Sequence, residues 1–261
     1  MSARAAYRLL TFAPMIDSET ARLLCRWYGT DYDERDHLFG WVSLLTLLHG
    51  GYGRAPLLYG DGTSLSGPRE MVERFDRRAP PARRLLLAVT QAAGVEADWD
   101  AYNGSLASDV AVFTYFHLLP ERALMTPVFA ARVPPTEARL TPMLYPALRG
   151  LLSRLLRLRQ SRADAAERRI QTMFGAVDRR LGDGRPFLTG ARLTLGDIAF
   201  AAAAAPLLQP TGFTAPIPPL AAMPAAVRQL TERLEASRAA ALVARVYAAI
   251  DSDPASTGSS L

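Results

Sequence analysis

Apolar and polar positions follow two different periods in the first 76 residues. Short runs rich in aromatic and branched apolar residues predict β-strands, and apolar positions three or four residues apart predict helices. The predicted strands are 7–12, 30–36, 57–59 and 64–65, and the predicted helices are 18–28, 41–49 and 68–75. The order strand, helix, strand, helix, strand, strand, helix predicts a small α/β domain with a mixed sheet of the thioredoxin-like kind.

The rest of the chain shows only helical patterns. A segment rich in proline and arginine, 78–84, separates these patterns from the first domain. The predicted helices are 83–93, 98–119, 136–160, 163–181, 195–207, 220–236 and 237–250. We therefore expect a thioredoxin-like domain at 1–77, a linker at 78–84, an all-helical domain at 85–250 and a disordered tail at 251–261.

Composition and charge narrow the class of protein. Hydrophobic residues make up 49% of the chain, and the net charge of +5 comes from arginine, since the sequence contains no lysine. The densest arginine segment, 149–162, alternates with leucine, which is typical of an amphipathic helix and not of a nucleic-acid surface. The amino terminus lacks a signal-peptide pattern, and the longest apolar run, 198–208, is too short to span a membrane. We expect a soluble cytoplasmic protein that binds neither nucleic acid nor membrane.

The cysteine and histidine residues give little sign of chemistry. The single cysteine, Cys25, excludes an internal disulfide, and its helical context favours a buried structural thiol. His37, His49 and His117 are far apart and lack metal-ligand spacing with other side chains. The sequence therefore predicts no metal site.

The segment 187–202, FLTGARLTLGDIAFAA, carries the most specific local signal. Thr194 can cap the following helix while Asp197 reaches back to the Thr194 N–H, the reciprocal arrangement called a capping box. Leu193 can pack on Ile198 as a hydrophobic staple. We expect a structural role for this segment and no chemistry.

This capping segment, after a thioredoxin-like domain and a short linker, resembles the cytosolic glutathione S-transferase superfamily, as a divergent bacterial-type member. Weaker matching pieces are Arg22 in ETARLLCRWYGTDYD, Ala-Pro before the third strand, and VARVYA near the end. The resemblance covers roughly 7–250 and implies the two-domain fold, glutathione as co-substrate, a homodimer and a role in detoxification.

The family's first site feature is a Ser, Cys or Tyr near the end of the first strand, which contacts the glutathione sulfur. Alignment on Arg22 places Met15 at the usual Ser or Cys position and Thr11 at the Tyr position. Ser18 lies in the same loop, although its place in SETAR favours the N-cap of the first helix over a contact with the thiol. Ser18 and Thr11 are thus the candidate catalytic residues, and the adjacent Asp17 opposes a thiolate by like-charge repulsion.

Two further features of the family hold the glutathione backbone and its γ-glutamyl end. Ala55-Pro56 keeps the proline before the third strand, and we expect this bond to be cis. The family's acidic residue and serine at the start of the third helix are replaced by Gly67 and Pro68. The remaining anion-binding groups there are the backbone N–H groups of Arg69 and Glu70, the Ser66 hydroxyl and the Arg69 guanidinium. The candidate cofactor-binding residues are Ala55, Pro56, Ser66, Gly67 and Arg69.

Two functions are the main alternatives from the sequence, and a different chemistry on the same fold, or a different thiol cofactor, stays open as a third. The first is a transferase with an atypical glutathione site, which conjugates glutathione to small apolar electrophiles. The second is a non-catalytic transferase-like protein that binds a ligand or a partner, and Met15, Gly67 and Pro68 favour it. Phe113, Phe116 and Met143 either line a substrate wall or belong to the core.

Overall fold

The amino-terminal part of the protein is built on a four-stranded mixed sheet. The computed structural model describes residues 6–86 and 89–252, so the predicted disordered tail lies outside it from 253 onward. The strands are β1 Tyr7–Thr11, β2 Tyr32–Asp36, β3 Leu57–Gly60 and β4 Thr63–Ser66, in the order β2-β1-β3-β4. β1 pairs parallel with β2 and antiparallel with β3, and β3 pairs antiparallel with β4.

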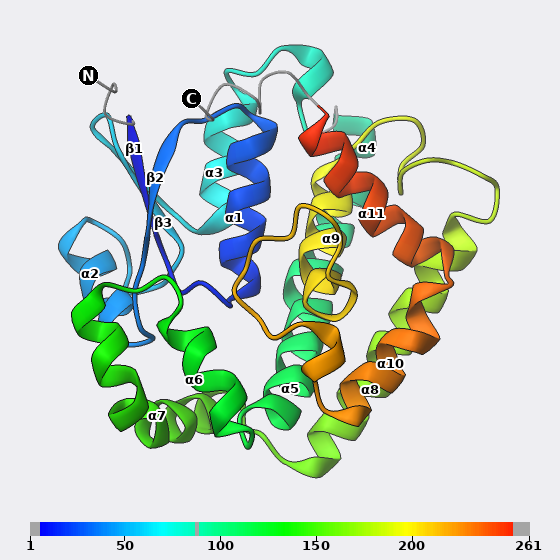
Figure 1. Ribbon diagram of the computed structural model, residues 1–261. Helices are drawn as coiled ribbons and strands as arrows, with labels where there is room; N and C mark the ends of the chain where they lie inside the picture. Colours follow the sequence, from blue (N-terminus) through cyan, green and yellow to red (C-terminus); the bar gives the residue numbers. More distant parts are fainter. Residues whose placement is uncertain (1–5, 87–88, 253–261) are drawn as a thin grey trace.

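Helices cover both faces of this sheet (Figure 1). They are α1 Ile16–Trp27 and α3 Gly67–Asp76 on one face and α2 Trp41–Leu48 on the other. Successive residues Leu9 and Leu10 of β1 are both buried, because neighbouring side chains of a strand point to opposite faces and each face is covered. The predicted thioredoxin-like domain is confirmed.

The carboxyl-terminal part is helical, as predicted. Its α-helices are α4 Val89–Trp99, α5 Ala107–Leu118, α6 Arg122–Ala130, α7 Pro135–Leu155, α8 Gln160–Arg180, α9 Leu195–Leu208, α10 Ala225–Glu235 and α11 Arg238–Asp251. Short 3₁₀ turns lie at Pro81–Arg83 and Leu220–Ala222. Helix α9 is buried over almost its whole length and packs against α1, α4, α5 and α11 (Figure 1). The core of the helical part is therefore arranged around α9.

Several predicted helices have different limits in the structure, among them the helix predicted at 220–236, which is a 3₁₀ turn followed by α10. The single helix predicted at 98–119 contains a π-helical segment, Asp100–Leu106, between α4 and α5. The helix predicted at 83–93 corresponds to α4, which the structure describes from Val89 to Trp99, while Pro81–Arg83 forms a 3₁₀ turn. The helix predicted at 136–160 ends at Leu155, and Arg157 then adopts a positive φ of 50° in the turn before α8.

Helix α6 was missed because Pro127 was interpreted as a break. A proline inside a helix removes one backbone hydrogen bond. The buried side chains of Met125, Val128 and Phe129 offset that loss, since each contributes roughly 1.5–3 kcal/mol of apolar burial. Tertiary packing has here overridden a local signal.

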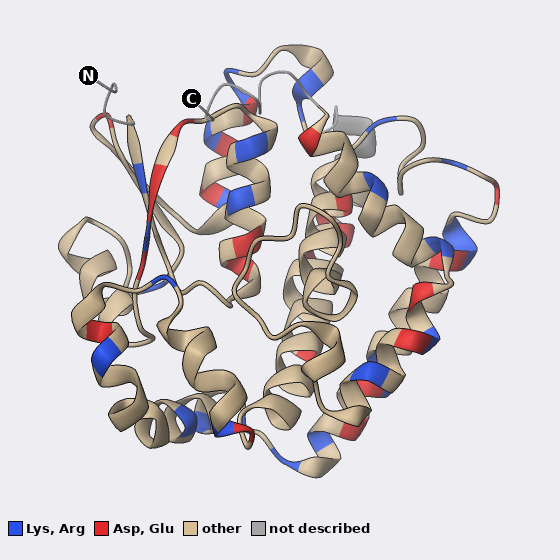
Figure 2. Ribbon diagram, viewed as in Figure 1, with Lys and Arg blue, Asp and Glu red and all other residues tan. Residues whose placement is uncertain are grey.

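Charged side chains of both signs are mixed over the helical part. Figure 2 shows blue and red positions following one another along α8. The arginine-rich segment 149–162 covers the end of α7, the turn and the start of α8, so it is not one amphipathic helix. None of the helices within 6–86 and 89–252 combines the length and the hydrophobicity needed to cross a membrane.

Two buried carboxylates connect the two parts of the chain. Asp76 at the end of α3 accepts hydrogen bonds from the backbone N–H groups of Leu85 and Leu86, at 2.7 and 2.9 Å. Glu137 of α7 accepts one from the N–H of Leu38 at 2.8 Å and contacts the His37 ring nitrogen at 2.7 Å. These contacts hold the linker and α7 against the sheet domain. The domain limits 1–77, 78–84 and 85–250 stay a prediction.

Candidate functional site

Arg22 fixes the loop between β1 and α1, where the family's reactive residue is expected. Its guanidinium is buried and pairs with Glu19 at 3.0 Å and Glu34 at 2.8 Å, and it donates to the Ala13 carbonyl at 3.2 Å. Burial alone would lower the pKa of Arg22, but the carboxylates of Glu34, Glu19 and Asp36 hold it above its ordinary value. The loop is therefore tied to a charged cluster inside the domain.

Ser18 lies inside the protein and not at the surface of a cavity. Helix α1 begins at Ile16 with Met15 in the N-cap position, so Ser18 is the third helical residue and its interpretation as the N-cap is wrong. Its hydroxyl is fully buried and donates to the Phe12 carbonyl at 3.0 Å. The hydroxyl is thus already used within the fold, and this geometry does not favour its predicted contact with a thiol.

Thr11 is equally inaccessible. It is fully buried, and its hydroxyl donates toward the carboxylates of Glu34, at 3.0 Å, and Asp36. Burial and the neighbouring Glu34 raise the pKa of Asp36. The second predicted catalytic residue therefore belongs to the charged cluster around Arg22.

A cleft of about 710 Å³ lies against the predicted cofactor-binding residues. It is lined by Met15, Asp17, Phe39, Val42, Ser43, Tyr52, Gly53, Arg54, Ala55, Ser66, Gly67 and Glu70. The Ala55-Pro56 bond is cis, as predicted, and the Pro56 carbonyl accepts from the Gly67 N–H at 2.9 Å. The structure thus places Ala55, Ser66 and Gly67 on the wall of one cleft. Pro56 is not among the lining residues but is hydrogen-bonded to Gly67. We call this space the polar cleft.

The start of α3 differs from the sequence prediction in one respect. The Arg69 guanidinium does not line the polar cleft, because it pairs with Glu73 at 2.8 Å and with Glu96 of α4 at 2.5 Å. The Glu70 carboxylate instead faces this end of the helix and accepts from the Ser66 N–H at 2.7 Å. The side chain that faces the cleft at the start of α3 is therefore the negative Glu70 and not the positive Arg69 that the sequence predicted.

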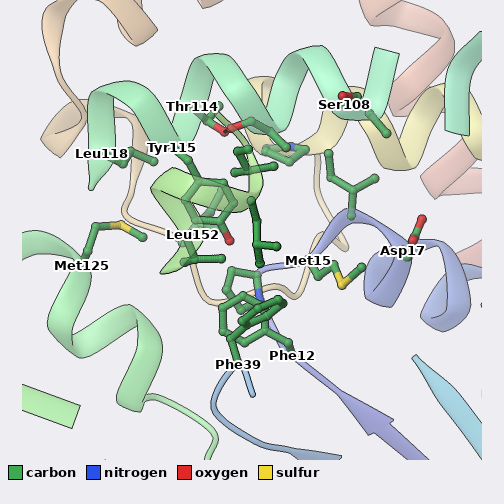
Figure 3. A pocket seen from close by; sticks show the side chains of 18 of the residues that line it. Phe12, Met15, Asp17, Phe39, Ser108, Thr114, Tyr115, Leu118, Met125 and Leu152 are labelled. Carbon is green, nitrogen blue, oxygen red and sulfur yellow. Dashed lines mark hydrogen bonds between the residues drawn. The ribbon is translucent and has the colours of Figure 1, made fainter. Parts of the chain in front are cut away.

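A second cavity of about 380 Å³ adjoins the first, and we call it the apolar pocket (Figure 3). Its walls come from the β1–α1 loop and the first turn of α1, the β2–α2 loop, α5, α6, the end of α7, the end of α9 and the segment after α9. They are formed by Phe12, Pro14, Met15, Ile16, Asp17, Phe39, Ala107, Ser108, Ala111, Thr114, Tyr115, Leu118, Met125, Leu152, Leu155, Leu156, Pro206, Ile217, Pro218 and Met223. The two cavities share Met15, Asp17 and Phe39, so they meet at the first turn of α1.

Asp17 is the charged side chain at this junction. Its carboxyl is hydrogen-bonded to Asn103 in the π-helical segment, and burial, the larger effect, raises its pKa. A π-helical turn often occurs where a helix must present a side chain to a site. Here the turn brings the Asn103 carboxamide to the Asp17 carboxyl, which the sequence alone gave no means to foresee.

The other residues considered from the sequence lie elsewhere. Phe113 is buried in the core, Met143 is 70% exposed, and neither they nor Phe116 line the apolar pocket. Cys25 is fully buried, and burial raises the pKa of its thiol, which makes it a poor nucleophile. Among the described residues, no group of His, Cys, Asp and Glu side chains could hold a metal ion.

Comparison with known proteins identifies this arrangement. Residues 160–228 match the sequence profile of the family described as glutathione S-transferase, C-terminal domain. A glutathione S-transferase from Sinorhizobium meliloti superposes with a TM-score of 0.57 over 97% of this chain and 91% of that chain, at 17% identity. The chain has the glutathione S-transferase fold. No curated protein sequence matches it significantly.

Further solved structures with the glutathione S-transferase fold are also similar to this chain. A transferase from Ceriporiopsis subvermispora in complex with glutathione gives a TM-score of 0.61 at 13% identity, covering 95% of this chain and 99% of that chain. A β-etherase from Sphingobium gives 0.58 at 15% identity, covering 96% of both chains. The predicted resemblance to this superfamily is confirmed for the fold and for the profile-matched part of the helical domain.

Within this fold, sequence reasoning overlooked two charged side chains of the polar cleft. Arg54 is exposed at the cleft and forms no ion pair among the described residues, and the Glu70 carboxylate lines the same cleft at the start of α3. Arg54 directly precedes the cis Ala55-Pro56 bond, and Glu70 lies four residues after Ser66. The closeness of both residues to predicted cofactor-binding positions was the signal in the sequence that could have identified them. Alignment to the family pattern indicated Arg69 instead.

Proposed function

We propose that the chain binds glutathione in the polar cleft and conjugates it to small apolar electrophiles held in the apolar pocket. The observation that carries this proposal is the junction of the two cavities at Met15, Asp17 and Phe39. A peptide thiol bound in one cavity and an apolar compound bound in the other would meet there. Structures with a similar fold from Methylobacillus flagellatus and Ceriporiopsis subvermispora hold glutathione.

The charges of the polar cleft support a zwitterionic ligand. Glutathione carries two carboxylates and one ammonium group. The Arg54 guanidinium can pair with a carboxylate, and the Glu70 carboxylate can accept from the ammonium group. Ala55 follows Arg54 in the sequence and lines the same cleft, together with Ser66 and Gly67.

The proposed transfer relies mainly on placing the two reactants together. Met15 has no proton to donate, and the hydroxyls of Ser18 and Thr11 are buried and engaged. The thiol would lose its proton to solvent, and the thiolate sulfur would form a bond to the electrophilic carbon as a leaving group departs. We therefore expect slow conjugation.

The buried hydroxyls of Ser18 and Thr11 also favour a second candidate, a non-catalytic protein with the same fold that binds a small apolar ligand. The two candidates differ in one measurable property. A conjugating enzyme accelerates the reaction of glutathione with an apolar aryl halide above the rate in buffer, whereas a binding protein does not.

The charged residues of the cleft give a direct mutational test by calorimetric titration with reduced glutathione. Arg54→Ala is expected to weaken binding about 10- to 100-fold, the effect of losing a hydrogen bond to a charged group. Arg69→Ala is the matched control, since its guanidinium is held by Glu73 and Glu96, and we expect less than about a twofold change.

The opposite pattern, with binding weakened by Arg69→Ala and not by Arg54→Ala, would restore the assignment made from the family pattern. Absence of binding to the unmodified chain up to about 10 mM glutathione, a free energy of only about 2–3 kcal/mol, would contradict the transferase proposal. The ligand-binding alternative would then stand.

We further propose that the protein is a cytoplasmic homodimer with a detoxifying role, as the resemblance implies. Large apolar side chains exposed on α2 and α7 support an association surface, because monomeric proteins seldom leave such side chains grouped at the surface. They are Trp41, Leu44, Leu47, Leu48, Leu140, Met143, Leu151 and Leu155.

A further inference from the structure

The apolar pocket contains one polar group that the fold leaves unused. The hydroxyl oxygen of Tyr115, on α5, is buried and has no hydrogen-bond partner among the described residues. Tyr115 lines the apolar pocket, and Figure 3 shows its ring extending from α5 with the hydroxyl end toward Leu152, another lining residue. A buried hydroxyl without a partner is unfavourable, so a ligand that satisfies it is favoured.

The other polar groups around the pocket do not compete for this role. The Thr114 hydroxyl already donates to the Val110 carbonyl at 2.7 Å. Ser108 is exposed at the rim, and Asp17 is hydrogen-bonded to Asn103 at the junction with the polar cleft. Tyr115 therefore supplies the free hydrogen-bonding group deep in the pocket.

The charge of the pocket limits the ligand to neutral compounds. Neither arginine nor histidine lines it, so an anion would lie in an apolar cavity without a counter-charge and near the Asp17 carboxyl. A cation would find only Asp17, whose carboxyl is already hydrogen-bonded to Asn103. Burial also raises the pKa of Tyr115, which keeps the phenol protonated and able to donate.

We propose that the apolar pocket selects neutral, largely apolar molecules that carry an acceptor oxygen, and that the Tyr115 hydroxyl donates a hydrogen bond to this oxygen. A phenolic O–H is a stronger donor than acceptor, because the ring withdraws the oxygen lone pair. The volume of about 380 Å³ accommodates a compound of two aromatic rings. The inference rests on the proposed function in taking this pocket as the electrophile site, but binding in it requires no glutathione.

Two probes of similar shape separate the hydrogen bond from apolar contact. Benzophenone carries one carbonyl oxygen, and diphenylmethane has a methylene group in its place. Equilibrium dialysis without glutathione gives the affinity of the full chain and of Tyr115→Phe for each probe. We expect Tyr115→Phe to weaken benzophenone binding about 5- to 30-fold and to leave diphenylmethane binding within about twofold, as for loss of one hydrogen bond to a buried group.

Tyr145→Phe is the matched control. The Tyr145 hydroxyl donates to the Leu119 carbonyl at 2.8 Å, and Tyr145 does not line the apolar pocket. This variant should bind both probes as the unmodified chain does, and the melting temperatures of both variants verify that they fold.

Three results would overturn the inference: equal weakening of both probes by Tyr115→Phe, unchanged benzophenone binding, or no binding of either probe to the unmodified chain. A failure of glutathione binding with the probe results as expected would reject the proposed transferase activity and leave this inference standing.

Discussion

Replacing Arg22 by alanine is expected to lower the free energy of unfolding by about 3–5 kcal/mol, because it leaves buried carboxylates without their counter-charge. Arg22 is 1% exposed and pairs with Glu19 and Glu34, while Asp36 lies at 3.8 Å. The Tyr247 hydroxyl of α11 donates to Glu19 at 2.9 Å, so the loss also affects the contact between the sheet domain and the helical domain. Urea denaturation measures the effect.

Arg35→Ala is the control for the Arg22 variant. Arg35 lies on β2 and pairs with Asp33, but both side chains are about half exposed. Exposed pairs contribute about 0–1 kcal/mol, so we expect little change in unfolding free energy. If both variants lose less than about 1 kcal/mol, the cluster around Arg22 is solvated or protonated and does not fix the β1–α1 loop.

Asp197→Ala is expected to cost about 2–4 kcal/mol of stability, since it leaves several buried donors unpaired. The Asp197 carboxylate is fully buried and accepts from the Thr194 N–H at 2.8 Å, the Thr194 hydroxyl at 2.6 Å and the Leu188 N–H at 2.8 Å. Burial raises the pKa of Asp197, and these hydrogen bonds oppose that rise. Thermal and urea unfolding report the loss.

The matched control for Asp197 is the isolated N-cap of α11. The Ser237 hydroxyl accepts from the Ala240 N–H at 3.1 Å, and Ser237→Ala should cost about 1 kcal/mol, as expected for loss of a single cap. If Asp197→Ala lowers the stability no more than Ser237→Ala does, then Asp197 acts only as a local cap. Its hydrogen bond to the Leu188 N–H would then contribute little.

Features set by nearby residues were predictable from the sequence. The reciprocal contact of Thr194 and Asp197 depends on residues three apart, and the structure has the predicted capping box. Close packing explains the glycine inside that motif, because a Cβ at Gly196 would lie 2.6 Å from the Cβ of Asp98 on α4. The order of strands and helices along the first domain and the cis Ala55-Pro56 bond likewise follow from strong local patterns and the family resemblance.

Features set by distant residues were not predictable. The direction of Arg69 depends on Glu96, which lies in another helix, and no local pattern connects the two. The role of Ser18 depended on where α1 begins, and a shift of two residues moved its hydroxyl from a cap position to the interior. The unused hydroxyl of Tyr115 results from packing of segments that are far apart in the sequence, so the apolar helical pattern around it could not single out this residue.

The central claim is that the polar cleft and the apolar pocket form one site that meets at Met15, Asp17 and Phe39. Its most direct test is calorimetric titration of the unmodified chain with reduced glutathione and, separately, with S-hexylglutathione. We predict that both bind and that the hexyl compound binds at least about tenfold more tightly, because each buried methylene contributes roughly 0.8 kcal/mol. Equal affinities would show that the hexyl chain does not enter the apolar pocket, and no binding of either compound up to about 10 mM would contradict the account as a whole.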